Sequence, residues 1–166
     1  MPSFHRIMHG KALYQLDLLV NMDETSWRLS YTADMTWAKK GSPSPRINVD
    51  YNPKECFTTV AAVNATSKKL LLYILASGTT PRCERSIKTN ETDHEYQTDH
   101  SANGWMTEAV MKRYLQWFRN QKNMKHNIEG KPIHLVLDVY AAHRTEDVRE
   151  LADTLKIKLY YISWLF

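Results

Sequence analysis

Two aspartates, Asp23 and Asp138, are the residues of this chain that are best placed to do chemistry. Each follows an apolar, strand-like run: Asp23 comes after residues 16–22, and Asp138 comes within residues 133–140. A carboxylate is costly to bury without a partner, and two that converge on one sheet edge most naturally share a metal ion. The pair therefore predicts a metal site, which a third acid would complete.

Two residues close to these aspartates have more than one interpretation. Glu24 either orients Asp23 or is simply solvated, and we favour the solvated side chain. His143 follows Asp138 by one short loop, and it either contacts a nucleic acid or holds that loop by a hydrogen bond. We favour the hydrogen-bonding role for His143.

Other residues that could bind metal have a plainer explanation. Cys56 and Cys83 lack CxxC spacing and a matching histidine pair, so we do not expect a zinc site. We expect both cysteines to be reduced thiols. Thr-Asp-His occurs twice, at 92–94 and 98–100, within the polar stretch 77–104. We interpret that stretch as a long surface loop and not as a metal site.

The pattern of apolar residues predicts the elements that would position the two aspartates. Alternation and short apolar runs predict strands, and apolar residues at helical spacing predict helices that begin after Thr107 and Thr145. Val110, Met111, Tyr114, Leu115, Trp117 and Phe118 form the apolar face of the first helix, and Val148, Leu151, Ala152 and Leu155 that of the second. The predicted strands are 16–22, an arm at 27–37, a hairpin of 57–63 and 70–75, then 133–140 and 157–162.

The order of these elements predicts an α/β fold. Strands joined by short turns come first, and strands joined by helices follow, which indicates an antiparallel half continuing into a parallel half. We expect an RNase H-like fold: a mixed five-stranded sheet, three antiparallel strands and then two parallel ones, with flanking helices. In such a sheet the functional groups gather at the carboxyl ends of the central strands.

The length and charge of the chain limit the number of domains and the classes of partner that we expect. The 166 residues fit one domain, and 22 basic against 18 acidic residues give a net charge of +4, which permits a polyanionic partner without demanding one. The longest apolar stretch, 70–76, is too short to span a bilayer, and residues 1–11 lack the apolar run of a signal peptide. We expect a soluble intracellular protein that has no membrane partner.

Four segments in order resemble a known family. They are NMDETSW at 21–27, FTTVAAVNATSKKLLLYIL at 57–75, ANGWMTEAVMKRYLQWF at 102–118 and VLDVYAAHRT at 136–145. They resemble the catalytic domain of DDE-type transposases (the DDE superfamily endonucleases) of the mariner–pogo superfamily. The resemblance is to the pogo, Tigger, jerky and centromere-protein-B branch, and it extends over roughly residues 16–162.

This resemblance implies a metal-dependent enzyme that acts on DNA. In the family three carboxylates hold two divalent metal ions, usually Mg²⁺ (or Mn²⁺), for phosphoryl transfer at the DNA backbone. Asp23 matches the first acid and Asp138 the second, which makes both catalytic and metal-binding candidates. The family's third acid lies beyond the last strand, but residues 163–166 (SWLF) hold no acid and no proline-containing turn. We therefore expect a lead-in at 1–15, an incomplete or degenerate domain at 16–162 and a tail outside the family pattern.

The resemblance also implies DNA as the partner and the nucleus as the location. A homodimer is a further expectation, and the family's DNA-binding helix-turn-helix region has no counterpart here. The alternatives are a non-catalytic nucleic-acid-binding remnant or domesticated module and, less favoured, a ribonuclease H-like or exonuclease-like enzyme. The residues that we expect to face nucleic acid are Lys39, Lys40, Lys68, Lys69, Lys112, Arg113, His143 and Arg144.

Overall fold

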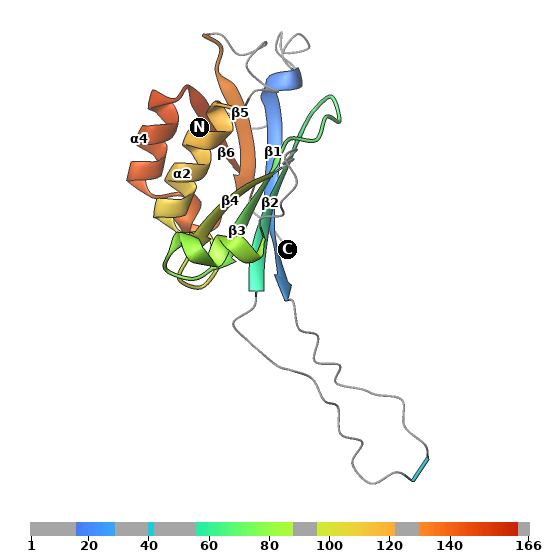
Figure 1. Ribbon diagram of the computed structural model, residues 1–166. Helices are drawn as coiled ribbons and strands as arrows, with labels where there is room; N and C mark the ends of the chain where they lie inside the picture. Colours follow the sequence, from blue (N-terminus) through green and yellow to red (C-terminus); the bar gives the residue numbers. More distant parts are fainter. Residues whose placement is uncertain (1–15, 29–39, 42–55, 88–95, 122–129, 163–166) are drawn as a thin grey trace.

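Six strands form one mixed sheet in a computed structural model that describes residues 16–28, 40–41, 56–87, 96–121 and 130–162 (Figure 1). The strands are β1 (Leu19–Arg28), β2 (Cys56–Asn64), β3 (Leu72–Ser77), β4 (Tyr96–Ser101), β5 (Ile133–Asp138) and β6 (Ile157–Ile162). Their order across the sheet is β4-β3-β2-β1-β5-β6, so β1 and β5 are central neighbours.

Five of the six strands run in one direction. β2 pairs antiparallel with both β1 and β3, whereas β3 with β4, β1 with β5 and β5 with β6 pair in parallel. The carboxyl ends of β1, β3, β4, β5 and β6 therefore point to the same edge of the sheet. The predicted mixed sheet and the 57–75 hairpin are confirmed.

The prediction of five strands was wrong because β4 lies inside the stretch that we expected to be a loop. Residues 77–104 contain β4 and a short 3₁₀ helix, η2 (Pro81–Ser86). The strand reads YQTDHS and has no apolar alternation. Its buried positions, Thr98 and Asp99, are polar side chains that are satisfied by hydrogen bonds and ion pairs, so a hydrophobic pattern could not reveal it.

β1 is longer than predicted and carries Asp23 in its interior. The expected strand ended at residue 22, but β1 pairs with β2 continuously from Val20 opposite Asn64 to Arg28 opposite Cys56. The sequence pattern predicted Asp23 at the end of a strand, and this prediction was wrong. The first two residues of the predicted arm at 27–37 belong to β1, and residues 29–37 lie outside the described part of the chain.

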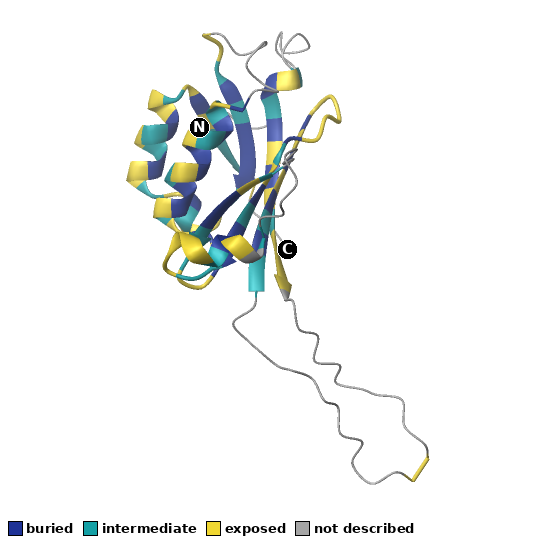
Figure 2. Ribbon diagram, viewed as in Figure 1, coloured by how far each residue is buried: buried dark blue, intermediate teal, exposed yellow. Residues whose placement is uncertain are grey.

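Two helices, α2 (Glu108–Arg119) and α4 (Glu146–Thr154), pack together against one face of the sheet (Figure 1). The predicted N-cap of α2 is confirmed, because Oγ1 of Thr107 accepts a hydrogen bond from the Val110 backbone N–H at 3.3 Å. Thr145 also lies at the N-cap of α4, but its side chain makes no capping bond. Figure 2 shows the buried sides of both helices turned to the sheet.

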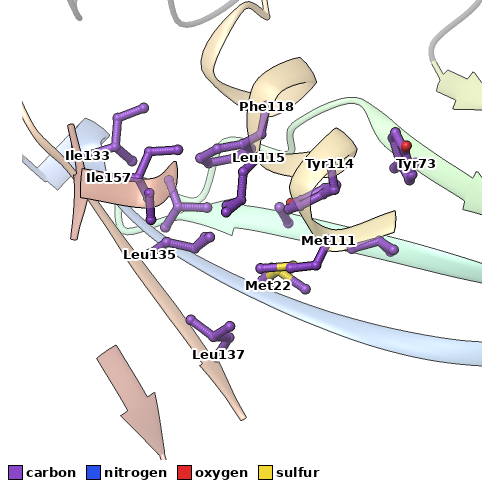
Figure 3. Packing of buried hydrophobic residues seen from close by; sticks show 14 of the residues in the cluster. Met22, Tyr73, Met111, Tyr114, Leu115, Phe118, Ile133, Leu135, Leu137 and Ile157 are labelled. Carbon is purple, nitrogen blue, oxygen red and sulfur yellow. The ribbon is translucent and has the colours of Figure 1, made fainter. Parts of the chain in front are cut away.

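The hydrophobic core lies between this face and the helices. Alternate residues of β1 and β5 pack against α2, whose apolar face is the one that its spacing predicted (Figure 3). Burying each large apolar side chain contributes roughly 1.5–3 kcal/mol. The central members are Val20, Met22, Met111, Tyr114, Leu115, Phe118, Leu135 and Leu137.

Candidate metal-binding site

Asp23 and Asp138 lie two residues beyond the last pair that joins the neighbouring parallel strands β1 and β5. In the parallel pairing of β1 and β5, Leu19 lies opposite His134 and Asn21 opposite Val136. Continuing this register by two residues sets Asp23 level with Asp138. Since side chains alternate between faces, both aspartates lie on the face opposite the helices. Asp23 is exposed there and the Asp138 side chain is 42% exposed.

Each of the two carboxylates is held by one oxygen. Oδ1 of Asp23 accepts the backbone N–H of Glu24 at 2.8 Å, and Oδ1 of Asp138 accepts the backbone N–H of Tyr140 at 3.1 Å. Within the described residues, Oδ2 of neither aspartate takes part in a hydrogen bond or ion pair. One oxygen of each side chain is thus available to a ligand from solvent.

Glu24 points to the opposite face of β1 and is not solvated as we favoured. It shares that face with Met22, and its side chain is 20% exposed. Its Oε1 lies 2.8 Å from Nε2 of His143. Burial and the nearby Glu24 charge both raise the pKa of Tyr114 on α2. Glu24 is therefore a partner of buried groups.

His143 is a buried residue that holds the loop after β5. A short 3₁₀ helix, η3 (Ala141–His143), turns the chain back so that the imidazole, 2% exposed, lies between two carboxylates. Nδ1 of His143 lies 2.8 Å from Oδ1 of Asp138, and the hydroxyl of Tyr161 donates to the His143 carbonyl at 2.8 Å. This geometry matches the hydrogen-bonding role and leaves little of the ring exposed to a nucleic acid.

The electrostatic setting of His143 has two opposing parts. Burial lowers the pKa of the imidazole, but the hydrogen bond that the ring donates to Glu24 and the charges of Glu24 and Asp138 outweigh burial and raise the pKa above its usual value. The cluster of Asp23, Glu24, Asp138 and His143, here named the metal-site cluster, has three carboxylates and one imidazole.

The donor set of Asp23 and Asp138 fits a hard divalent cation. Mg²⁺ and Mn²⁺ prefer carboxylate oxygen ligands, and both aspartates offer an oxygen without a protein partner on the same face. Glu24 cannot serve as a third ligand in this arrangement, because its carboxylate lies on the other face and contacts His143. Among the described residues, one group of three acidic, histidine or cysteine side chains has its potential ligand atoms close enough together to share a metal, and it lies apart from Asp23 and Asp138.

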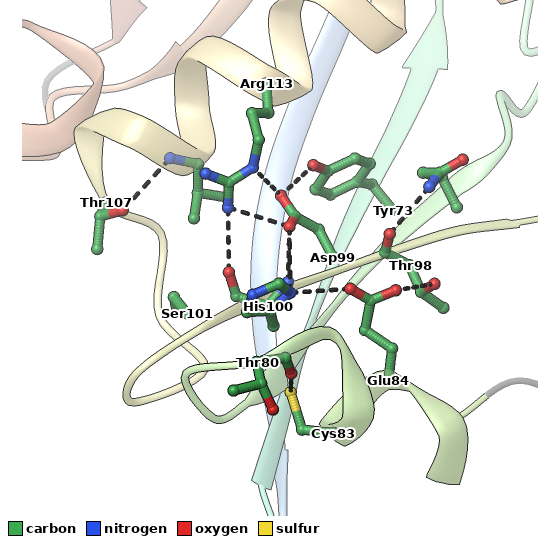
Figure 4. A network of polar contacts seen from close by, with 12 residues as sticks. Tyr73, Thr80, Cys83, Glu84, Thr98, Asp99, His100, Ser101, Thr107 and Arg113 are labelled. Atoms are coloured by element: carbon green, nitrogen blue, oxygen red, sulfur yellow. Dashed lines mark hydrogen bonds and ion pairs between the residues drawn. The ribbon is translucent and has the colours of Figure 1, made fainter.

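That other group, Glu84, Asp99 and His100, has its potential ligand atoms within 4.8 Å of one another (Figure 4). Arg113 of α2 contacts both oxygens of Asp99, at 2.8 Å and 3.0 Å, and the hydroxyl of Tyr73 donates to Oδ2. His100 Nδ1 lies 2.8 Å from Oε1 of Glu84. The atoms that a metal would need are already used by the protein.

The second hydroxyl in this group is that of Thr98, which donates to Oε2 of Glu84 at 2.8 Å. Burial, followed by the Asp99 hydrogen bond, raises the pKa of Tyr73, so its hydroxyl stays protonated and donates. We name these six residues, Tyr73, Glu84, Thr98, Asp99, His100 and Arg113, the β4 network. Sequence reasoning missed this network, and the second Thr-Asp-His triplet was its only signal; the first triplet lies outside the described residues.

The predicted basic residues do not gather at one place. Lys40 is exposed, Lys68 and Lys69 are exposed in the turn after β2, and Arg144 is exposed directly after His143; Lys39 lies outside the described part. Because β2 runs against its neighbours, the turn with Lys68 and Lys69 lies at the opposite end of the sheet from Asp138.

Two of the predicted basic residues on α2 take part in ion pairs. Nζ of Lys112 lies 3.2 Å from Glu108 and 2.8 Å from Asp147 of α4. Arg113 binds Asp99, as described above. Of the predicted DNA-facing residues in the described part of the chain, Arg144 is the one adjacent to the metal-site cluster.

Comparisons with known proteins agree with this fold. The model of a family described as DDE superfamily endonuclease matches residues 54–163, a range that includes Asp138 and His143 but begins after Asp23. No curated protein matches the chain. No helix among the described residues is long and apolar enough to cross a membrane.

Two solved structures resemble the chain in fold. One is a Mos1 mariner paired end complex with Mn, with 15% sequence identity and a TM-score of 0.52. The other is a Mos1 transposase paired-end complex with the left transposon end, with 14% identity and a TM-score of 0.50. Each match covers 93% of this chain and 38% of the other, so the chain spans well under half the length of either. The predicted RNase H-like fold is confirmed.

Proposed function

The chain belongs to the DDE superfamily endonuclease family, and we propose that it binds a divalent cation, Mg²⁺ or Mn²⁺, through Asp23 and Asp138 and acts on DNA by phosphoryl transfer. The observation that carries this proposal is the β1–β5 register, in which Asp23 and Asp138 each follow the last pair of these neighbouring parallel strands by two residues. Their like charges on one face repel one another, and a cation between them offsets that repulsion.

The protein groups around the site would bind the cation and orient its ligands and the DNA. When bound, a divalent cation polarises a phosphoryl oxygen and activates a nucleophile. Asp23 and Asp138 supply oxygen ligands, and the Tyr140 backbone N–H fixes one oxygen of Asp138. We assign Arg144, which is exposed directly after η3, to contact with a DNA phosphate near the site.

The finer assignment within the family is also part of the proposal. We assign the chain to the pogo, Tigger, jerky and centromere-protein-B branch on the four sequence segments described above, with DNA as partner and the nucleus as location. The Mos1 complexes contain Mn and transposon ends, which supports a divalent cation and DNA for this chain. We assign the domain to residues 16–162, in which Asp23 and Asp138 match two of the family's acids.

Nucleic-acid binding without cleavage is the second candidate. The observation that favours it is the position of Glu24: the one further carboxylate of the metal-site cluster is committed to His143. With two ligating carboxylates, metal binding is weaker than with three, and cleavage suffers first.

A plasmid-nicking assay tests the proposal. We expect supercoiled plasmid to be nicked in the presence of Mg²⁺ or Mn²⁺, and nicking to disappear in Asp23→Asn and in Asp138→Asn. Asp153→Asn is the matched control, because Asp153 is an exposed aspartate of α4 on the helix side. DNA binding that survives both site variants and EDTA, without any nicking, would instead establish the binding module.

A further inference from the structure

One imidazole joins the two aspartate motifs, although they lie far apart in the sequence. Nε2 of His143 lies 2.8 Å from Oε1 of Glu24, which is the residue next to Asp23. Nδ1 of the same ring lies 2.8 Å from Oδ1 of Asp138. The ring thus bridges β1 and the end of β5 from the helix side of the sheet.

The burial of His143 makes these contacts consequential. Its side chain is 2% exposed, and a buried ring nitrogen without a partner costs free energy. Nδ1 has no well-directed hydrogen bond even though Oδ1 of Asp138 is 2.8 Å away. The Asp138 carboxylate is thus a charged group within contact distance of this buried nitrogen.

The two oxygens of Asp138 differ in their protein contacts. Oδ1 contacts Nδ1 of His143 and accepts the Tyr140 backbone N–H, while Oδ2 has no partner among the described residues. Glu24 is fixed by the ring, and its backbone N–H in turn binds Oδ1 of Asp23. A group behind a metal ligand that fixes its orientation commonly raises metal affinity by 10- to 100-fold, as an order of magnitude.

We propose that His143 and Glu24 are positioning residues of the metal site: Glu24 holds the ring through Nε2, and the ring holds Oδ1 of Asp138 through Nδ1, so that Oδ2 is presented to the cation. This proposal rests on the proposed function, because it assumes that Asp138 binds metal. It adds residues of the opposite face to a site that the two aspartates alone would define.

Binding of Mn²⁺ to the isolated chain, followed by EPR of the free ion, tests the proposal without requiring DNA cleavage. Two amide substitutions separate the two ring contacts, since the Asn amide takes the place of Nδ1 and the Gln amide takes the place of Nε2. We expect His143→Ala to lower the affinity for Mn²⁺ by about 10- to 100-fold. His143→Asn should retain more of that affinity than His143→Gln, and Glu24→Gln should lie between wild type and His143→Ala.

A destabilising control separates positioning from packing. Val148→Ala removes a buried side chain of α4 that has no contact with the carboxylates, so it should lower the melting temperature and leave Mn²⁺ affinity unchanged. If the His143 and Glu24 variants fold and bind Mn²⁺ as wild type does, the positioning role is overturned while the metal site stands. If wild type itself binds no Mn²⁺, both the metal site and the positioning role fall.

Discussion

The metal-site cluster and the β4 network both combine carboxylates with a histidine near the carboxyl ends of parallel strands, yet they balance their charge differently. In the β4 network, Arg113 and the Tyr73 hydroxyl cover both oxygens of Asp99. In the metal-site cluster, one histidine lies between two carboxylates, those of Glu24 and Asp138, and Oδ2 of Asp23 and of Asp138 has no partner among the described residues. The first arrangement is complete without an ion, whereas the second leaves negative charge for one to neutralise.

This difference is the basis for proposing a metal site at one cluster and not at the other. Proximity alone selects the β4 network, because its potential ligand atoms lie within 4.8 Å of one another. The number of oxygens left without a donor selects the metal-site cluster instead. Counting hydrogen-bond partners is thus more informative here than counting acidic residues.

Substitution of Asp138 should have the largest effect, and this effect should be on Mn²⁺ affinity and not on stability. Asp138→Asn removes the charge of a proposed ligand whose side chain is 42% exposed. We expect Mn²⁺ affinity to fall by about 100-fold, whereas the free energy of unfolding changes by no more than about 1 kcal/mol. Isothermal calorimetry and urea denaturation measure the two quantities, and a large loss of stability would break the comparison.

Substitution of Asp99 should show the reverse pattern. Asp99→Asn leaves Arg113 without its ion pair and Tyr73 without its charged acceptor. We expect the free energy of unfolding to fall by about 2 kcal/mol, a figure kept low because the Arg113 side chain is 46% exposed. Mn²⁺ affinity should equal that of wild type, and a loss of Mn²⁺ binding in a folded variant would mean that the β4 network is itself a metal site.

A matched pair of tyrosine substitutions sharpens the contrast. Tyr73→Phe removes a donor to the Asp99 carboxylate, and Tyr161→Phe removes a donor to the uncharged His143 carbonyl. Hydrogen bonds to charged groups contribute more, so we expect losses of about 2 and about 1 kcal/mol, respectively. Chemical denaturation measures both variants, and equal losses would show that charge does not set the strength of the β4 network.

The smallest effect should come from acid acting on the surface pair between the helices. The Lys112 ammonium lowers the pKa of Asp147, so this pair contributes stability above the usual pKa of an aspartate and loses it as pH falls through the lowered pKa. Between roughly pH 4 and pH 2, Asp147→Asn should therefore lose less stability than wild type. Thermal melting across this range measures the difference, which high salt should abolish.

Local patterns predicted most of the elements, and the exceptions share a cause. The α2 face, the Thr107 cap, the hairpin and the strand ending at Asp138 all follow from periodicity or capping within a short window. β4 did not follow, because its buried side chains are satisfied by Glu84 and Arg113, which lie elsewhere in the chain.

The sequence by itself determined the mixed α/β sheet with its helices and the two aspartate motifs, because side-chain type and spacing act locally. Tertiary structure alone decided that Asp23 lies within β1 and that β1 pairs in parallel with the strand that ends at Asp138, because strand register depends on pairing between distant segments. It also decided that Glu24 turns inward to His143, since alternation in a strand sends neighbouring residues to opposite faces. Which carboxylates meet a cation and which meet a protein donor is a property of that packing.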